Sequence, residues 1–377
     1  SYGVSVTAQA AGVSSATVSA GPVLVGGGTG TGDFVPVGPI RSYDYRNPGA
    51  GGPWSSGQTR TVPVSGVAGV PANGVAAVAV AISVVAPDAA GFLTVWPSGS
   101  SRPLATAVNF VAGQTKTNLV KVPVDATGLM SIYNFTGTAG VTIDVVGYYI
   151  DGTATFTHNV SYQSVTPNRA LDTRTGPAPA PVPGGGMTTA TVRGGSTGVP
   201  ATATAVEIQV EAIDPAAAGY LTVWATGAPK PIVSNVLYGA RQTIVTSAIA
   251  PIGADGTISI YTNVATHIAV DICGYYDASA GGRFHAITTT RLYDTRNPGA
   301  TPYGPTTTRT IPVAGVPVTI NATTTTPVPT SATSVVFAAT TVNNTSASFL
   351  TFWPGNQGKP LPPCCCPTPQ TSSPTTS

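Results

Sequence analysis

The sequence predicts an all-β protein of tandem antiparallel β-sandwich domains, jelly-roll or immunoglobulin-like, the third of them incomplete. Three observations predict this class: a composition suited to short strands, a long internal repeat, and apolar runs of strand length within each copy. Gly (44) and Pro (35) are abundant, and only 8% of the residues are charged. Because β-branched residues fill strands while Gly and Pro mark turns, this composition favours strands over helices.

The same composition excludes several classes of protein. Apolar residues make up 42% of the chain, which argues against disorder. The net charge is only +2 and Lys and Arg do not cluster, so the electrostatic footprint of a nucleic-acid-binding protein is missing. No apolar run approaches the roughly 20 residues that span a bilayer. We expect no cofactor and no metal site.

The first element is an N-terminal arm, residues 1–33, which matches no other part of the chain. Its segments "YGVSVTAQ" and "SATVSAGPVLVG" have the pattern of strands, and "GGGTGTG" has the composition of a flexible hinge. The chain starts at Ser1 without a leader, so we expect a mature secreted protein with an extracellular or cell-surface location.

After the arm comes a repeat that opens each time with R-x-x-D-x-R. The residues of this opening are Arg41, Asp44, Arg46, Arg169, Asp172, Arg174, Arg291, Asp294 and Arg296. Each copy is large enough to form its own core. We predict units at 34–152, 160–278 and 284–361, joined by linkers 153–159 and 279–283 and followed by a Pro/Thr/Cys-rich tail at 362–377.

Later landmarks keep the same order within each copy. "GFLTVWPSG" at Gly91 returns as "GYLTVWATG" at Gly219 and as "SFLTFWPGN" at Ser348. "GVTIDVVGYY" at Gly140 then matches "HIAVDICGYY" at His267, whereas the third copy has no counterpart after Leu361. Turn residues separate these runs at about the 8–12-residue spacing of antiparallel sandwiches.

These landmarks resemble a repeat of secreted and surface proteins of actinobacteria and related bacteria, with the pattern R-x-x-DTR, GYLTVYP, GQT and VDVxGYY. The resemblance spans about residues 34–151, 160–277 and 284–361. It implies an accessory β-module appended to varied secreted proteins and implies no enzymatic activity.

Charged residues in the repeat predict buried ion pairs. Asp144 and Asp271 stand in otherwise apolar strands, where an unpaired carboxylate would be costly. We predict that Asp144 pairs with Arg41 or Arg46, and that Asp271 pairs with Arg169 or Arg174, because a guanidinium offers a planar fork to a carboxylate. A calcium or sugar site is the alternative, but one carboxylate per repeat supplies too few oxygens for calcium.

Aromatic residues leave two interpretations open. Trp96, Trp224 and Trp353 either pack in the core or offer a flat face to a sugar ring. Tyr149 and Tyr276 each follow another tyrosine, and neighbouring side chains point to opposite faces of a strand. One tyrosine of each pair should therefore be partly exposed, with a domain junction as a candidate place.

The remaining motifs predict little chemistry. "GGSTG" at Gly194 fits the nucleophile motif G-x-S-x-G, but the strand-like sequence that follows it argues against a hydrolase, and we predict no enzyme. The tail carries three adjacent cysteines that are candidates for inter-chain disulfides: Cys364, Cys365 and Cys366. Five asparagines fall in glycosylation sequons: Asn134, Asn159, Asn321, Asn343 and Asn344.

The third copy and the arm together suggest a function. A copy that stops early would expose unpaired strand edges, which are templates for strands of another chain. We therefore expect a structural subunit of an extracellular filament or surface layer, in which the arm of one copy enters the third unit of its neighbour, head-to-tail. The partner is then the protein itself. The alternatives are an adhesin that binds cell-surface glycans, and a stalk of a larger secreted enzyme.

Overall fold

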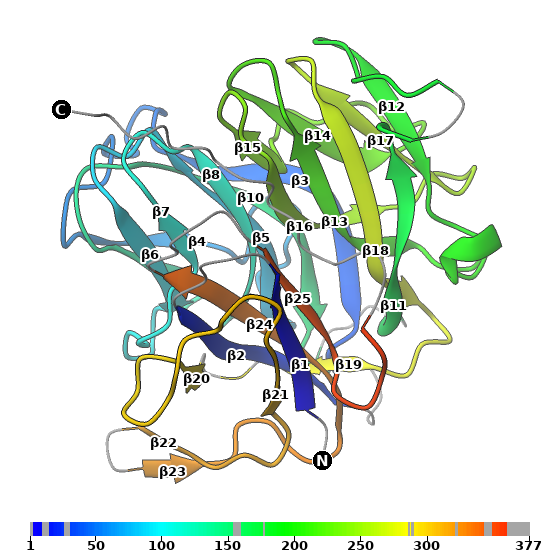
Figure 1. Ribbon diagram of the computed structural model, residues 1–377. Coiled ribbons are helices and arrows are strands. Elements are labelled where there is room, and N and C mark those ends of the chain that lie inside the picture. The colour runs from blue at the N-terminus through cyan, green and yellow to red at the C-terminus, as the bar shows by residue number, and fades with distance from the viewer. Residues whose placement is uncertain are drawn as a thin grey trace, which may run out of the picture.

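The expected all-β fold is confirmed by the computed structural model (Figure 1), which describes residues 3–9, 15–25, 31–153, 160–175, 178–285, 287, 290–320, 323–342 and 349–359. Within these ranges the one helical element is the short 3-10 turn η1 (Gly195–Thr197). The strands form three units, each made of two antiparallel sheets.

Unit one is a complete sandwich. Its first sheet has the order β3 (Phe34–Asp44), β10 (Gly140–Ile150), β5 (Val75–Val85) and β8 (Lys116–Pro123). Its second sheet has the order β4 (Thr59–Pro63), β9 (Leu129–Asn134), β6 (Gly91–Pro97) and β7 (Val108–Phe110). Alternate residues of both sheets, such as Val80, Ile82 and Ile132, meet in one fully buried core.

Unit two has the same strand order. Its first sheet consists of β11 (Ser161–Asp172), β18 (His267–Asp277), β13 (Ala205–Ile213) and β16 (Ile244–Pro251). Its second sheet consists of β12 (Met187–Thr191), β17 (Thr257–Thr262), β14 (Gly219–Ala225) and β15 (Val236–Tyr238). The internal sequence repeat is therefore a repeat of the fold.

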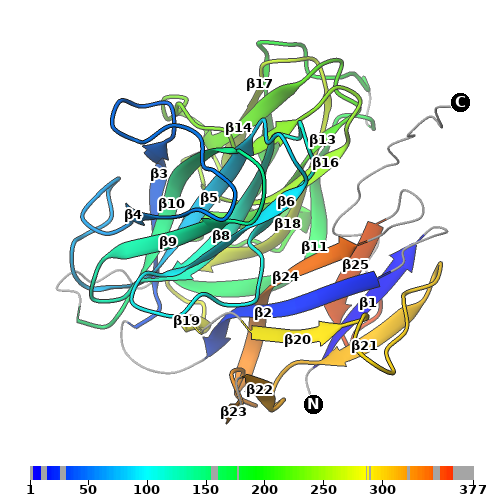
Figure 2. The ribbon, with the colours of Figure 1, turned by 90° about the vertical axis from the view of Figure 1, so that its left-hand side faces the viewer.

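Unit three is assembled from both ends of the sequence. In one sheet β2 (Ser15–Val25) lies between β20 (Thr290–Asp294) and β24 (Ala332–Val342), and β19 (Arg283–His285) also pairs with β2. In the other sheet β1 (Gly3–Gln9) lies between β21 (Thr308–Pro312) and β25 (Phe349–Pro354). Figure 2 shows the blue N-terminal strands among the yellow and red strands of this unit. The arm thus fills the third unit of its own chain.

The Thr-rich insertion of unit three forms a separate hairpin. It consists of β22 (Val318–Ile320) and β23 (Thr323–Thr325), which pair only with each other among the described strands. The same part of the protein has no group of His, Cys, Asp or Glu side chains that could hold a metal ion. Where the chain is described, it also has no helix long and apolar enough to cross a membrane.

Candidate functional site: the strand-filled third unit and the junction of the units

The strand β2 repeats the pairing of β10 residue by residue. Ser15 pairs with Val342 as Gly140 pairs with Val85, and the irregularity that follows Val18 in β2 matches the one that follows Ile143 in β10. The arm segment therefore occupies the place of the closing strand of a repeat, and it does so in the same register.

The strand β1 repeats β9 in the same way. Val4 pairs with Pro354 as Met130 pairs with Pro97, and Thr7 pairs with Thr308 in the way that Tyr133 pairs with Thr59. The segments "GVSVTA" of β1 and "LMSIYN" of β9 even share a serine at the same register position. Together β1 and β2 supply the last two strands of the repeat.

The expected ion pairs take a definite form in units one and two. Arg41 donates Nε and Nη2 to the two carboxylate oxygens of Asp144, and its Nη1 to Asp44 at 2.8 Å. Arg46 binds Asp44 rather than Asp144. Asp144 is almost fully buried, and burial raises its pKa against the opposing effect of Arg41.

Unit two has the same arrangement around Asp271. Arg169 donates Nε and Nη2 to Asp271, and Nη1 to Asp172 at 2.7 Å. The hydrogen bond from Arg174 lowers the pKa of Asp172 to about 2, even though burial opposes the shift. In both complete units, one arginine thus bridges the closing strand and the opening motif.

Unit three keeps the opening motif and lacks the carboxylate on the closing strand. Arg296 binds Asp294 at 2.6 Å, and Arg291 binds the same carboxylate at 3.2 Å. The arm residue that pairs with Arg291 is Ser19, at the register position that Asp144 and Asp271 hold in the other units. The buried Nε of Arg291 has no hydrogen bond within the described structure, while its Nη2 donates to Leu104 O of unit one at 3.1 Å.

The three units meet in a cyclic set of backbone hydrogen bonds. Phe34 N donates to Val160 O at 2.8 Å, Tyr162 N donates to Gly282 O at 2.8 Å, and Phe284 N donates to Gly32 O at 3.1 Å. Phe34, Tyr162 and Phe284 each stand seven residues before the first arginine of their own unit. The units are therefore related by an approximate threefold symmetry at this point, and the ring of contacts is closed.

Aromatic side chains fill the centre of this junction. The Tyr149 ring stacks on Phe284 with centroids 3.9 Å apart, and the Phe34 ring lies 4.4 Å from Tyr276. Both tyrosines are buried between units. The expectation of one partly exposed tyrosine per pair is met by Tyr275 in unit two and is wrong in unit one, where Tyr148 is buried as well. Gly147 is required here, since a Cβ would lie 2.2 Å from the ring of Phe34.

A buried ion pair also crosses the junction of units one and two. Lys121 Nζ of β8 lies 2.9 Å from Glu207 Oε2 of β13, and the hydroxyl of Tyr276 donates to the same oxygen at 3.1 Å. Burial lowers the pKa of Lys121, but Glu207 and Tyr149 together outweigh it, so that the net shift is upward. Sequence reasoning missed this pair, because the two residues lie in different repeats and stand at non-equivalent positions.

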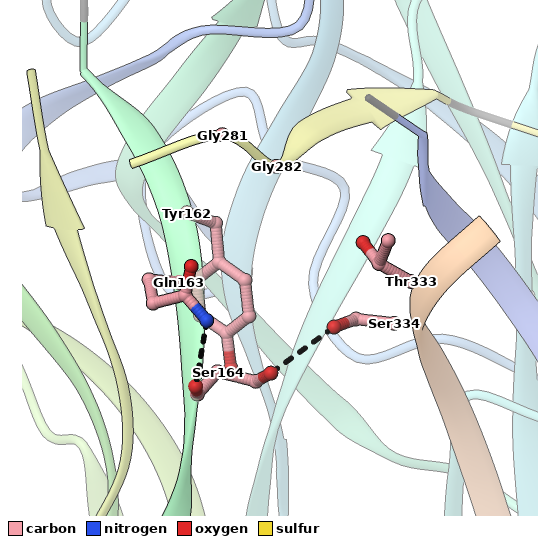
Figure 3. Close-up of a pocket in the computed structure, with 7 residues that line it drawn as sticks. All are labelled: Tyr162, Gln163, Ser164, Gly281, Gly282, Thr333 and Ser334. Carbon is pink, nitrogen blue, oxygen red and sulfur yellow. Dashed lines mark hydrogen bonds between the residues drawn. The ribbon is translucent and has the colours of Figure 1, made fainter. Parts of the chain in front are cut away.

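Figure 3 shows the junction of units two and three. The hydroxyls of Ser164 (β11) and Ser334 (β24) face each other across a small pocket, 3.2 Å apart. The pocket is lined by Tyr162, Gln163, Ser164, Gly281, Gly282, Thr333 and Ser334. These lining residues offer no nucleophile, base and acid in catalytic arrangement.

The tryptophans are buried, but outside the sandwich cores, which hold the neighbouring residues Val95 and Val223 instead. Trp96, Trp224 and Trp353 are 8%, 6% and 9% exposed, and Trp224 Nε1 donates to Ala228 O at 2.9 Å. Their low exposure therefore favours packing over sugar binding, although the packing is outside the core that was expected.

Asn134, one of the five candidate glycosylation sites, is inaccessible in the folded protein. This residue is fully buried, and its Nδ2 donates to the carbonyl oxygens of Trp54, Ser55 and Gly137. An attached glycan would remove these bonds and could not fit. The other candidates lie outside the described residues: Asn159, Asn321, Asn343, Asn344, Cys364, Cys365 and Cys366.

These observations define a protein of three β-sandwich units around an approximate threefold junction, with one unit closed by the N-terminal strands. No family model matches the chain, and no curated protein matches it. One solved chain, from "Life in the extremes: atomic structure of Sulfolobus Turreted Icosahedral Virus", aligns over 65% of this chain and 91% of its own length at 10% identity. The TM-score is 0.17, which is too low to support any argument about fold or function.

Proposed function

We propose that the protein is a non-enzymatic structural subunit of an extracellular filament or surface layer, and that it assembles by exchanging its N-terminal arm between copies. One observation carries the proposal: the arm provides the central strand of both sheets of unit three. Without β1 and β2, the described parts of β20, β24, β21 and β25 have no pairing with one another.

Exchange requires no new interface. The ladders of β1 and β2 have the same partners whether the arm comes from the same chain or from a neighbour. Only the connection between Val25 and Thr31 would change its course, and its sequence is "GGGTG". Gly-rich segments adopt many backbone conformations at low cost. Exchange of an identical element is a low-cost route to association, and a head-to-tail exchange that does not close builds a fibre.

The composition supports an assembled extracellular protein. With 8% charged residues and a net charge of +2, neighbouring copies repel each other weakly. The partner is the protein itself. Recognition of cell-surface glycans would need residues other than the buried tryptophans.

Deletion of residues 1–30 tests the proposal. We expect that the shortened chain forms no fibres in negative-stain images, while units one and two stay folded by circular dichroism. A matched pair of point variants in the full-length chain tests whether the pairing of β2, rather than the mere presence of the arm, is needed for fibres. Ser19→Pro removes a backbone donor inside β2 and should prevent fibres, whereas Ala11→Pro falls between the two arm strands in the sequence and should not. Fibres that persist in Ser19→Pro, or that are absent from the intact chain, would contradict the proposal.

A further inference from the structure

A groove of about 950 Å³ lies between the three units, and β24 and β25 contribute to its lining. Unit three lines it with core-type residues, among them Phe337, Leu350 and Phe352. Unit one lines a second wall with the end of β6, the loop that follows it, β7 and β8, including Trp96 and Leu119. Unit two lines a third wall with the polar outer face of its first sheet, including Gln209 and Ser247. No described strand lies on the free edge of β24 or of β25.

Units one and two show what covers this place in a complete repeat. In unit one β8 pairs along β5, and β7 pairs along β6. In unit two β16 and β15 do the same for β13 and β14. By register β24 and β25 are the counterparts of β5 and β6, so each lacks its outer neighbour among the described strands.

Burial along β24 shows the consequence for the core. Ile82 and Val84 of β5 are fully buried, and their counterparts in unit two, Val210 and Ala212, are fully buried as well. Their counterparts on β24 are Ala339 and Thr341, which pair with Val18 and Ala16 of β2, and both are exposed. The core of unit three is therefore open towards the groove.

We propose that this groove is a binding site for a strand-forming segment of another polypeptide, which adds one antiparallel strand to β24 and one to β25. Its inward residues are β-branched or aromatic, as Val108, Phe110, Val120 and Val122 are in unit one. Its outward residues are polar, because they meet the wall that carries Gln209 and Ser247. Main-chain pairing gives affinity in this mode of recognition, and alternate side chains give specificity.

The chemistry of the ladder argues against residues 360–377 as the occupant of the groove. Residues 360–377 include prolines at 360, 362, 363, 367, 369 and 374. Proline has no backbone donor for a ladder, and a strand so rich in proline would leave the edges unpaired. The groove has the same lining whether the arm comes from its own chain or from a neighbour. A negative result for peptide binding would therefore leave the proposal of arm exchange untouched, and the reverse also holds.

A synthetic peptide of residues 105–124, which is the β7–β8 segment of unit one, is the probe for the intact chain. We expect saturable binding with one peptide per chain by fluorescence anisotropy, and slower amide exchange in β24 and β25. A peptide with Val120→Asp and Val122→Asp should bind at least about tenfold more weakly, because its carboxylates would enter the apolar core. A control peptide with Lys121→Gln changes only an outward residue and should bind normally.

A chain variant tests the site from the other side. Ala339→Asp places a charge on an exposed position of the groove and should weaken peptide binding about tenfold. Thr324→Asp, on the exposed β22–β23 hairpin, should leave binding unchanged. Absence of peptide binding, or equal binding by the Val120→Asp/Val122→Asp peptide, would overturn the proposal. So would a gain of about tenfold or more on removal of residues 360–377, since these residues would then be the occupant.

Discussion

Replacing Ser19 by Asp should strengthen the attachment of the arm to unit three. Ser19 faces Arg291 in the register that sets Asp144 opposite Arg41 and Asp271 opposite Arg169. Arg291 already has a buried Nε without a hydrogen bond in the described structure. An aspartate at position 19 would therefore restore the ion pair that the complete units have.

The size of the effect follows from three contributions. A hydrogen bond to a charged group adds about 1.5–3 kcal/mol, and an unsatisfied buried donor costs about 1–3 kcal/mol. Burial of the new carboxylate costs several kcal/mol and offsets much of this gain. Since the Arg291 side chain is 33% exposed, solvent also screens the pair. We expect a net stabilisation of about 1 kcal/mol, which is roughly a fivefold change in an opening equilibrium.

Amide hydrogen exchange of β2 measures this opening directly. The Ser19→Asp variant should exchange its β2 amides about fivefold more slowly than the parent chain, while β10 and β18 stay unchanged. Ser19→Asn is the matched control, because it has nearly the same shape without the charge. Exchange in Ser19→Asp as fast as in Ser19→Asn would refute the assignment of position 19 to the place of Asp144.

Two further predictions concern the complete units. Asp144→Asn should destabilise unit one by about 2–3 kcal/mol, because it removes the buried carboxylate that accepts two hydrogen bonds from Arg41, which keeps only Asp44 as a partner. In denaturant melts the exposed Asp214→Asn should cost under about 0.5 kcal/mol, and equal losses would show that burial of the pair is not the cause. Burial raises the pKa of Glu211 to about 7 in the folded protein, whereas the same side chain has a pKa of 4.5 in the unfolded chain. Between these values the folded state binds more protons than the unfolded state, so the free energy of unfolding should fall as the pH rises from 4.5 to 7. The total loss of unfolding free energy over this pH range is roughly 3 kcal/mol. Glu211→Ser, which copies Ser83 of unit one, should remove that slope, and a slope that survives would locate the pH dependence elsewhere.

The repeats made most of the fold predictable from the sequence. Landmarks such as Arg41 and Asp144 recur with little change in spacing, and strands that alternate with turn residues predict sandwiches. The same landmarks indicated which charges would meet, although only the structure distinguishes Arg41 from Arg46 as the partner of Asp144. Two candidate arginines near one carboxylate cannot be separated by sequence spacing.

The incomplete third copy predicted that an arm enters a third unit, but the register of the arm strands could not be predicted in the same way. These strands precede unit one in the sequence, and the residues that identify a closing strand have changed, because Ser19, Val23 and Leu24 stand where unit one has Asp144, Tyr148 and Tyr149. What remains is an apolar alternation with β-branched residues, which predicts a strand and does not specify its partner. The signal that could have revealed it is the match of "GVSVTA" followed by "SATVSAGPVLV" to the last two strands of units one and two.

A disulfide trap between the arm and unit three tests most directly whether copies exchange arms. Thr7 of β1 pairs with Thr351 of β25, so cysteines at both positions, with the four native cysteines changed to serine, would link an arm to the unit that it fills. Exchange predicts a ladder of covalent multimers on a non-reducing gel of assembled material, which collapses to single chains on reduction. Single chains alone, in fully oxidised material that still forms fibres, would show that each arm stays in its own chain and would contradict the proposed assembly.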